Sequence, residues 1–170
     1  MGTRGFWGVR HDGRMRTTYN HYDSYPTGLG VSMVEFIQST DMATLGERVF
    51  ALAEVHEGDS PSPEQMQALV EAGTWMHVST GQDWYSALRG TQGEPEKMIE
   101  SGFWMTQDFD PTQANDSWLE WGYLIDLDAG ELLVYDIPYE KEPVVRRRIP
   151  FADLVDANAN EIMSAIESEE

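Results

Sequence analysis

Two strand–turn–strand patterns, one near each end of the chain, most strongly constrain how this sequence can fold. Residues 3–9 are rich in β-forming side chains, Asp12-Gly13 is a typical hairpin turn, and residues 15–21 return as a second strand. Residues 118–126 and 131–137, rich in aromatic and branched side chains, predict a second hairpin. We therefore expect a mainly antiparallel sheet, because the two strands of a hairpin run in opposite directions.

The region between the hairpins has the spacing of amphipathic helices. A break at residues 25–30 precedes a short helix at 31–37, and Thr40 or Asp41 can cap the helix that follows. The apolar positions of this second helix recur at helical spacing: Leu45, Val49, Leu52 and Ala53. Both helices can therefore pack one face against the sheet.

The clearest start of a helix lies at Ser62. Pro63 follows at the first helical position, Gln65 completes a capping-box pattern, and Gly73 marks the end of this third helix. A further short helical segment is expected at residues 83–88. The central part of the chain is thus predicted to be helical.

The end of the chain adds a strand at residues 144–149, and Pro150 then opens a C-terminal helix with these inward positions: Phe151, Leu154, Val155, Ile162 and Ile166. The tryptophans are expected in the core and in the sheet: Trp75, Trp84, Trp104, Trp118 and Trp121. The order of elements indicates a single α+β domain over residues 1–170, with helices packed on a mainly antiparallel sheet. An acidic frayed end is expected at about residues 167–170.

The chain is strongly acidic, with 30 aspartates and glutamates against 11 lysines and arginines and a formal net charge of −19. Such a charge repels nucleic acid and anionic membranes, so we expect neither direct nucleic-acid binding nor membrane association. It favours basic partners or cations. The basic residues gather at residues 4–16 and 146–148, where we interpret them as surface charges on strands.

The sequence contains no cysteine, so disulfides and thiolate chemistry are excluded. Its first residues lack a charged segment followed by an apolar stretch, which a secretory signal would need. No apolar run approaches the length of a membrane span. We therefore expect a cytoplasmic protein.

The densest group of polar and titratable side chains runs from Thr17 to Pro26. In an extended strand one face would carry Tyr19, His21 and Asp23, and the other would carry Asn20, Tyr22 and Ser24. His21 and Asp23 could then form an oriented acid–base pair, with Asn20 as an orienting group. The alternative is a strand end whose polar groups cap the next helix and satisfy one another.

The same region provides a candidate ligand site, formed by Tyr19, Tyr25, Gly28 and Gly30. Glycine has no side chain, so Gly28 and Gly30 would let the backbone approach a ligand closely. The tyrosines would supply ring surface and a hydroxyl group.

Segments at both ends of the chain share a pattern with other sequences. They are Thr3-Arg4-Gly5, Tyr19-Asn20-His21, Asp23-Ser24-Tyr25-Pro26, Gly28-Leu29-Gly30, Trp121-Gly122-Tyr123-Leu124-Ile125-Asp126-Leu127-Asp128 and Leu133-Val134-Tyr135. Together they resemble a group of uncharacterised proteins from actinobacteria and their phages. The resemblance implies a bacterial or phage source, and hence the cytoplasm of a bacterium or of a phage-infected host. It implies no activity.

The first hairpin begins at Thr3, turns at Asp12-Gly13 nine residues later, and carries Asn20 in its returning strand. This arrangement resembles the opening of N-terminal-nucleophile hydrolases, such as proteasome subunits and bile-salt hydrolases. The resemblance implies that Thr3 attacks an amide once processing after Gly2 exposes its amine as the general base. As written, Thr3 is internal, and Tyr19 stands where the proteasome has an aspartate. The alternative is an ordinary hairpin with Thr3 as a strand residue.

Metal and cofactor motifs are weak. Four residues have part of the spacing of a calcium loop, which a hairpin turn also explains: Asp126, Asp128, Gly130 and Glu131. The histidines are scattered, without zinc-ligand spacing, at His11, His56 and His77. Asp108-Phe109-Asp110-Pro111 is interpreted as a turn or a helix cap. We expect no metal and no cofactor, since no phosphate-binding or dinucleotide motif occurs.

Two functions are compatible with these features of the sequence. We favour a small acidic accessory protein that binds a ligand or a partner, such as a basic host protein, because the chain lacks a complete catalytic set. The alternative is a small amide hydrolase that uses the first hairpin, with four candidate catalytic residues: Thr3, Asn20, His21 and Asp23.

Overall fold

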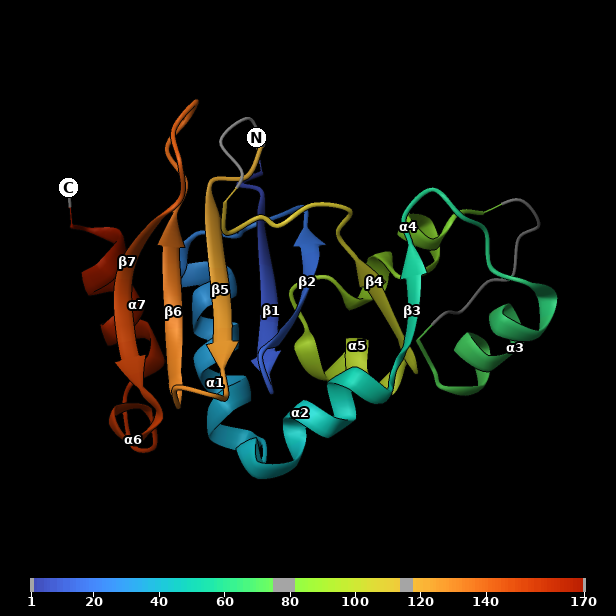
Figure 1. Ribbon diagram of the computed structural model, residues 1–170, viewed down its shortest axis with the longest axis horizontal. Coiled ribbons are helices and arrows are strands. Elements are labelled where there is room, and N and C mark those ends of the chain that lie inside the picture. The colour runs from blue at the N-terminus through green and yellow to red at the C-terminus, as the bar shows by residue number, and fades with distance from the viewer. Residues whose placement is uncertain (1, 75–81, 114–117, 170) are drawn as a thin grey trace.

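The two predicted hairpins join into one five-stranded sheet (Figure 1). The computed structural model describes residues 2–74, 82–113 and 118–169. In sheet order, the strands are β2 (Arg14–Asn20), β1 (Gly5–His11), β5 (Trp121–Asp126), β6 (Glu131–Asp136) and β7 (Val144–Pro150). The turn of the first hairpin is confirmed, because Asp12 and Gly13 have φ angles of 51° and 73°, as a tight two-residue turn requires.

The first strands of the two hairpins lie side by side and run parallel. β1 pairs with β5 in a register that places Gly5 opposite Trp121, whereas the other three pairings of the sheet are antiparallel. The prediction of a mainly antiparallel sheet is therefore confirmed. A parallel pair needs a long crossover connection, and the helical region between the hairpins supplies it.

Helices cover one face of this sheet, and in Figure 1 α1 and α7 lie behind the strands. The α-helices are α1 (Val31–Ser39), α2 (Met42–Ala51), α3 (Pro63–Glu71), α4 (Trp84–Ala87), α5 (Pro95–Glu100), α6 (Phe151–Leu154) and α7 (Ala159–Glu167). Trp7 and Tyr123 of the sheet belong to the same buried cluster as Met33 of α1 and Met163 of α7. The α+β class is therefore confirmed.

The opposite face of the sheet carries a second, smaller hydrophobic cluster. Phe6, Leu124 and Leu133 alternate along their strands with residues of the main core, because successive side chains of a strand point to opposite faces. Leu119, just before β5, joins this cluster, and Tyr19 packs against it. The end of β2 therefore presents Tyr19 on the face away from the helices.

A separate two-stranded parallel sheet lies beside β2, and it is not among the elements predicted from the sequence. It consists of β3 (Ala53–His56) and β4 (Phe103–Thr106). Two donors attach it to the carbonyl of Thr17 in β2: the backbone N–H of Gln107 and the indole N–H of Trp104, each at 3.2 Å. The edge of β2 is therefore hydrogen-bonded to the segment that contains β4.

The predicted second helix is too long by two residues. Asp41 caps α2 as expected, by accepting a hydrogen bond from the backbone N–H of Ala43. The helix ends at Ala51, however, and Leu52 adopts an extended conformation. Ala53 then pairs with Phe103 as the first residue of β3, so long-range strand pairing overrides the local helical spacing.

The predicted C-terminal helix is two helices. α6 is a single turn, and Asn158 begins α7 by accepting a hydrogen bond from the backbone N–H of Glu161. Val155 lies between the two helices and is 65% exposed, so its predicted inward position is wrong. At the acidic end, Glu169 forms an ion pair with Arg147 of β7.

The break expected at residues 25–30 is also more regular than predicted. Pro26 opens a π-helical turn, η1 (Pro26–Gly30), which runs directly into α1. Two of its hydrogen bonds meet at the carbonyl of Tyr25, which accepts from the backbone N–H groups of Gly28 and Gly30. Proline fits the first helical position because its missing N–H has no intrahelical partner there.

The third helix begins as predicted. Ser62 and Gln65 form both hydrogen bonds of a capping box, and Pro63 occupies the first turn. Gly73 follows the helix with a φ angle of 73°, which glycine adopts without strain. Across the described residues, no helix is both long and apolar enough to cross a membrane.

Candidate functional site

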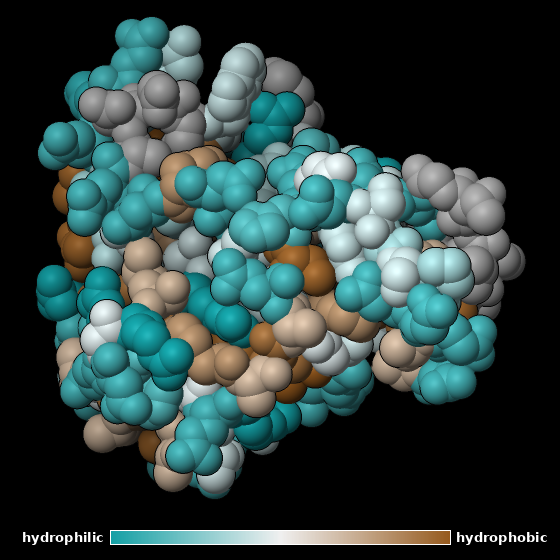
Figure 2. Space-filling view, turned by 45° about the vertical axis from the view of Figure 1, so that its right-hand side comes forward, coloured by the Kyte–Doolittle hydropathy of each residue, from teal (hydrophilic) through white to brown (hydrophobic). Residues whose placement is uncertain are grey.

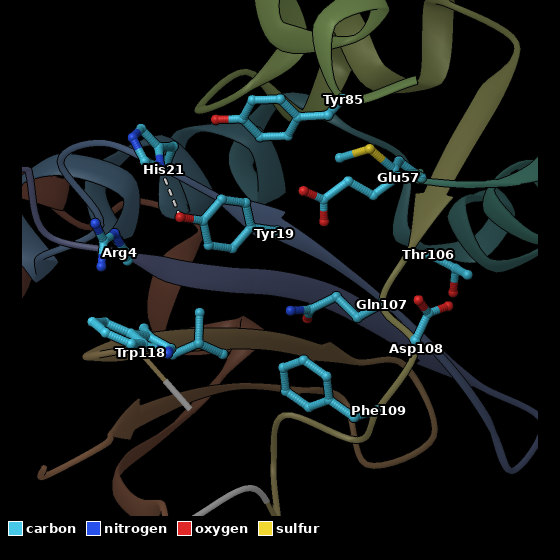
Figure 3. Close-up of a pocket in the computed structure, with 12 residues that line it drawn as sticks. Arg4, Tyr19, His21, Glu57, Tyr85, Thr106, Gln107, Asp108, Phe109 and Trp118 are labelled. Carbon is cyan, nitrogen blue, oxygen red and sulfur yellow. Dashed lines mark hydrogen bonds between the residues drawn. The ribbon is translucent and has the colours of Figure 1, made fainter. Parts of the chain in front are cut away.

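A cleft of about 700 Å³ opens at the edge of the sheet where β1 begins and β2 ends (Figure 3). Residues from several segments line it: the segment before β1, the end of β2, the turn after β3, helix α4, the segment after β4 and the segment before β5. Binding and catalytic residues are commonly found on such connecting segments, because a rigid scaffold positions them.

Strand registers determine which side chains meet in the cleft. In the first hairpin, Gly5 lies opposite Asn20, so Arg4 and His21 are neighbours just beyond the paired residues. In the small sheet, pairing of the last residues of β3 and β4 makes Glu57 and Gln107 neighbours in the same way. Residues that are distant in the sequence are thus brought to one edge.

Aromatic rings form two sides of the cleft. Tyr19 and Tyr85 lie on one side, with ring centroids 6.3 Å apart, and His21 lies 5.8 Å from Tyr19. Phe109 and Trp118 lie on the other side in Figure 3. Both are solvent-exposed, by 48% and 79% respectively. Large aromatic surfaces that face solvent commonly mark binding sites.

Tyr19 is the central polar group of the cleft. Its hydroxyl lies 2.7 Å from Nδ1 of His21, within hydrogen-bond distance. Partial burial raises the pKa of Tyr19 above its ordinary value, and the nearby Tyr85 and Glu57 raise it further, while Arg4 opposes the shift. The phenol is therefore neutral at physiological pH, and it can donate a proton to a hydrogen bond.

Charged groups of opposite sign lie at opposite ends of the cleft. Figure 3 shows Arg4 at one end, and Glu57 and Asp108 at the other. The Arg4 guanidinium lies over the Trp118 ring, 5.7 Å from its centroid. The cleft can therefore hold a ligand that carries charge at one end, and the aromatic rings between the ends can contact its apolar part.

The candidate catalytic residues have different environments. His21 lines the cleft. Asn20 is 1% exposed, and its amide group donates to the backbone carbonyl of Tyr22 at 2.6 Å and to Oγ of Ser24 at 2.8 Å. These bonds hold the turn that follows β2, which matches the alternative of polar groups that satisfy one another.

Thr3 and Asp23 lie outside the group of described residues that line the cleft. The carbonyl of Thr3 accepts a hydrogen bond from the backbone N–H of Ser24 at 3.0 Å. Asp23 has a φ angle of 51°, is exposed, and accepts from Leu29 through its backbone carbonyl. Among the described residues, its side chain makes no hydrogen bond to His21. A catalytic role for Thr3, Asn20, His21 and Asp23 stays a prediction.

Of the candidate ligand residues, Tyr25 directly precedes the η1 turn and Gly28 and Gly30 lie in it, away from the cleft lining. A side chain at Gly30 would come within 2.8 Å of the sulfur of Met163 in α7, and one at Gly28 within 2.2 Å of the carbonyl oxygen of Asp23. Both glycines therefore allow close packing inside the protein. Of the four predicted ligand residues, Tyr19 lines the cleft.

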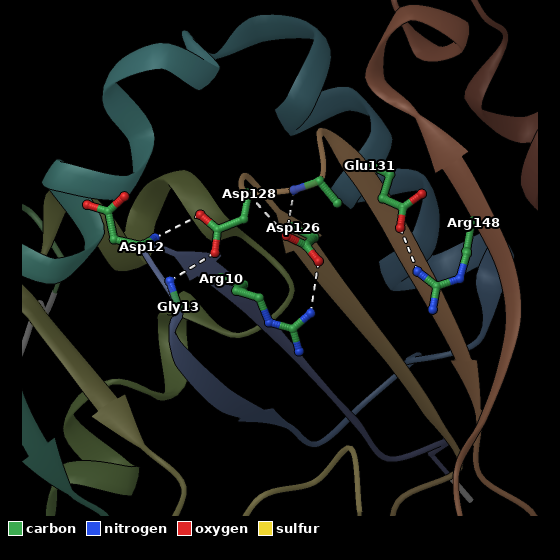
Figure 4. A network of polar contacts seen from close by, with 8 residues as sticks. Arg10, Asp12, Gly13, Asp126, Asp128, Glu131 and Arg148 are labelled. Atoms are coloured by element: carbon green, nitrogen blue, oxygen red, sulfur yellow. Dashed lines mark hydrogen bonds and ion pairs between the residues drawn. The ribbon is translucent and has the colours of Figure 1, made fainter.

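The acidic residues of the second hairpin stabilise turns (Figure 4). Both oxygens of the Asp128 carboxylate accept hydrogen bonds from the first hairpin, from the backbone N–H groups of Asp12 and Gly13 at 2.8 and 2.9 Å. These bonds lower the pKa of Asp128. Asp126 pairs with Arg10 at 2.8 Å. The carboxylate of Asp126 also accepts from the backbone N–H groups of Asp128 and Ala129, so these residues form the hairpin turn between β5 and β6.

Potential metal ligands also meet at this point. The side chains of His11, Asp12 and Asp128 offer ligand atoms that lie within 4.8 Å of one another, the one such group among the described residues. Both Asp128 oxygens already accept backbone hydrogen bonds. Of the other histidines, His56 contacts Asp108 at 2.9 Å, and His77 lies outside the described residues.

The tryptophans divide into buried and exposed groups. Trp84 and Trp104 are 3% and 0% exposed, as predicted for core residues. The prediction for Trp118 is wrong, because it lies at the mouth of the cleft instead of in the core. Trp121 is partly buried in the sheet, and Trp75 lies outside the described residues.

Sequence reasoning also missed Glu57, Tyr85 and Gln107. Their contribution depends on the pairing of β3 with β4 and on the contact between the small sheet and β2. The signal that could have found them is the aromatic and apolar run at residues 103–105, which has strand composition. Figure 2 shows the side of the molecule that carries the small sheet of β3 and β4, and apolar side chains gather across the middle of this side.

Comparisons with protein-family models, with curated proteins and with solved structures give no match. The fold and site define an α+β protein with an aromatic cleft at one edge of its sheet. One fold can host many functions, so the chemistry of the cleft is the guide to function.

Proposed function

We propose that this protein is a binding protein and that the cleft is its binding site for a polypeptide partner. The observation that carries the proposal is the exposure of Phe109 and Trp118 at the mouth of the cleft. Aromatic rings that protrude from such a surface contribute large contact areas to protein interfaces. The volume of about 700 Å³ is sufficient for several side chains of a partner.

The positions of the candidate catalytic residues favour binding over amide hydrolysis. Of the four residues, His21 lines the cleft, whereas Asn20 is buried in a turn and Asp23 is exposed elsewhere. An acid–base pair needs its members within hydrogen-bond reach of each other and of the substrate. A mature chain that begins at Thr3, detected by intact mass, would instead favour the hydrolase.

The net charge of −19 supports a basic partner. Opposite charges accelerate association, and salt screens this attraction over about 10 Å at 0.1 M ionic strength. Affinity for the partner should therefore fall as the salt concentration rises. Affinity that is independent of salt would argue against a basic partner.

A display library of random peptides tests the proposal directly. The purified protein and its Trp118→Ala variant are each used to select peptides, and retained peptides are compared by fluorescence anisotropy. We expect the wild-type protein to retain peptides whose affinity falls at least about tenfold with the variant, because aromatic anchors dominate such interfaces. Failure to retain any peptide, or equal binding to both proteins, would contradict the proposal.

A further inference from the structure

Hydrogen-bond acceptors without donors gather at one end of the cleft. Glu57 forms no ion pair with any described residue, and Figure 3 shows its carboxylate directed toward Tyr19. Oε1 of Gln107 is buried and has no hydrogen-bond partner within the described part of the chain. Buried polar atoms are nearly always paired. Glu57, by contrast, is exposed, so its carboxylate can pair with a ligand that brings N–H donors.

The rings beside these acceptors favour a cation. Tyr19 and Tyr85 flank Glu57 in Figure 3, and their rings form a tilted pair with an interplanar angle of 40°. The face of an aromatic ring attracts a cation, and a neighbouring carboxylate adds to that attraction. Arg4 lies at the far end of the cleft, over Trp118, so it leaves this end acidic.

We propose that this end of the cleft binds an arginine side chain of the partner polypeptide. The guanidinium has five N–H donors in one plane and can bond a carboxylate with two of them. It would pair with the carboxylate of Glu57 and lie against the ring of Tyr19 or Tyr85. The rest of the peptide would contact Phe109 and Trp118. This inference rests on the proposed function and specifies the recognised side chain.

Charge-matched peptides and variants test the inference. A peptide retained in the selection is synthesised with arginine, lysine or citrulline at each basic position, since citrulline has the shape of arginine without its charge. Binding is measured with wild-type protein, Glu57→Gln and Glu47→Gln. Glu47 is an exposed residue of α2 that does not line the cleft, so its variant removes the same charge elsewhere.

We expect the arginine peptide to lose about tenfold in affinity with Glu57→Gln and less than twofold with Glu47→Gln, because a hydrogen bond to a charged group is strong. The citrulline peptide should bind wild type weakly and be unaffected by Glu57→Gln. Lysine should bind with intermediate affinity, because it cannot make the paired contact. Unfolding curves of both variants serve as the check on folding.

Three results would overturn the inference while leaving the proposed function intact. They are retained peptides without basic residues, equal effects of Glu57→Gln and Glu47→Gln, and citrulline binding as tightly as arginine. Binding of N-acetyl-arginine amide with the affinity of the whole peptide would show a small-molecule site instead. If no peptide binds at all, the proposed function fails and the inference fails with it.

Discussion

The ring of Phe6 in β1 lies directly over Gly122 in β5. A side-chain carbon added at Gly122 would come within 2.1 Å of this ring, which is far closer than non-bonded carbon atoms approach. This contact exists because β1 and β5 are parallel neighbours in the register Phe6↔Gly122. The same pairing brings Arg4, just before β1, to the cleft beside the segment that precedes β5.

Replacing Gly122 by alanine should therefore lower the free energy of unfolding, by about 1–3 kcal/mol, as overpacked cores typically do. Gly58→Ala is the matched control, because a side chain there meets no atom within 4 Å, and it should change stability by less than about 0.5 kcal/mol. Urea unfolding followed by circular dichroism measures both. Equal stability of the two variants would contradict the parallel pairing of β1 with β5.

Asp128 should make stability depend on acid pH. Its hydrogen bonds to Gly13 and Asp12 lower its pKa below the ordinary value of 3.8. The stabilising contribution is therefore present above that ordinary value and is lost as the pH falls through the lower folded-state pKa. Wild type should be more stable than Asp128→Asn at neutral pH, and the difference should shrink between about pH 5 and about pH 2. A difference that stays constant over this range would refute the explanation.

Tyr123 should have the opposite pH dependence. Its buried hydroxyl donates to the backbone carbonyl of Ser24 at 2.8 Å, and burial, with a contribution from Glu167, raises its pKa well above 10.0. A group whose pKa is raised by folding stabilises the protein at pH values below the pKa of the unfolded state. This stabilisation is lost as the pH rises through the pKa of the folded state.

At neutral pH, Tyr123→Phe should therefore lower stability by about 1 kcal/mol, the typical net value of one hydrogen bond. The difference from wild type should narrow as the pH rises above about 10, because tyrosine ionisation then favours the unfolded wild-type chain. Chemical denaturation at neutral and alkaline pH tests this. A stability difference that widens at alkaline pH would contradict the raised pKa of Tyr123.

Asn20 and Trp118 should separate stability from binding. Asn20→Ala leaves buried groups of the turn unpaired, so it should lower the free energy of unfolding by about 1–3 kcal/mol and leave the peptide affinity of the folded protein unchanged. Trp118→Ala should lower the peptide affinity and leave the free energy of unfolding unchanged, because Trp118 is exposed. Loss of peptide affinity in a folded Asn20→Ala protein would place Asn20 in the binding site.

Local signals in the sequence predict the elements that depend on neighbouring residues. The turn at Asp12-Gly13 and the helix start at Ser62 are confirmed because a few adjacent residues determine each of them. The helix end at Ala51 could not be predicted in this way, because Ala53 is drawn into β3 by its pairing with Phe103. Short strands that pair across long separations leave little local signal.

In the candidate site, too, the sequence indicates residues of one segment but not those that strand pairing brings in. Tyr19 and His21 were found because a dense polar segment ends β2, and both line the cleft. Glu57 and Gln107 meet them only through the pairing of β3 with β4 and the contact of Gln107 with Thr17. No spacing within one segment of the sequence indicates that combination.

The most direct test of the binding cleft is an NMR titration of the isotope-labelled protein with a retained peptide. We predict that the indole N–H signal of Trp118 shifts, together with backbone signals of Tyr19, Glu57 and Gln107, while the indole signals of buried Trp7 and Trp104 stay in place. Shifts confined to residues outside the cleft, with the Trp118 signal unchanged, would contradict the account.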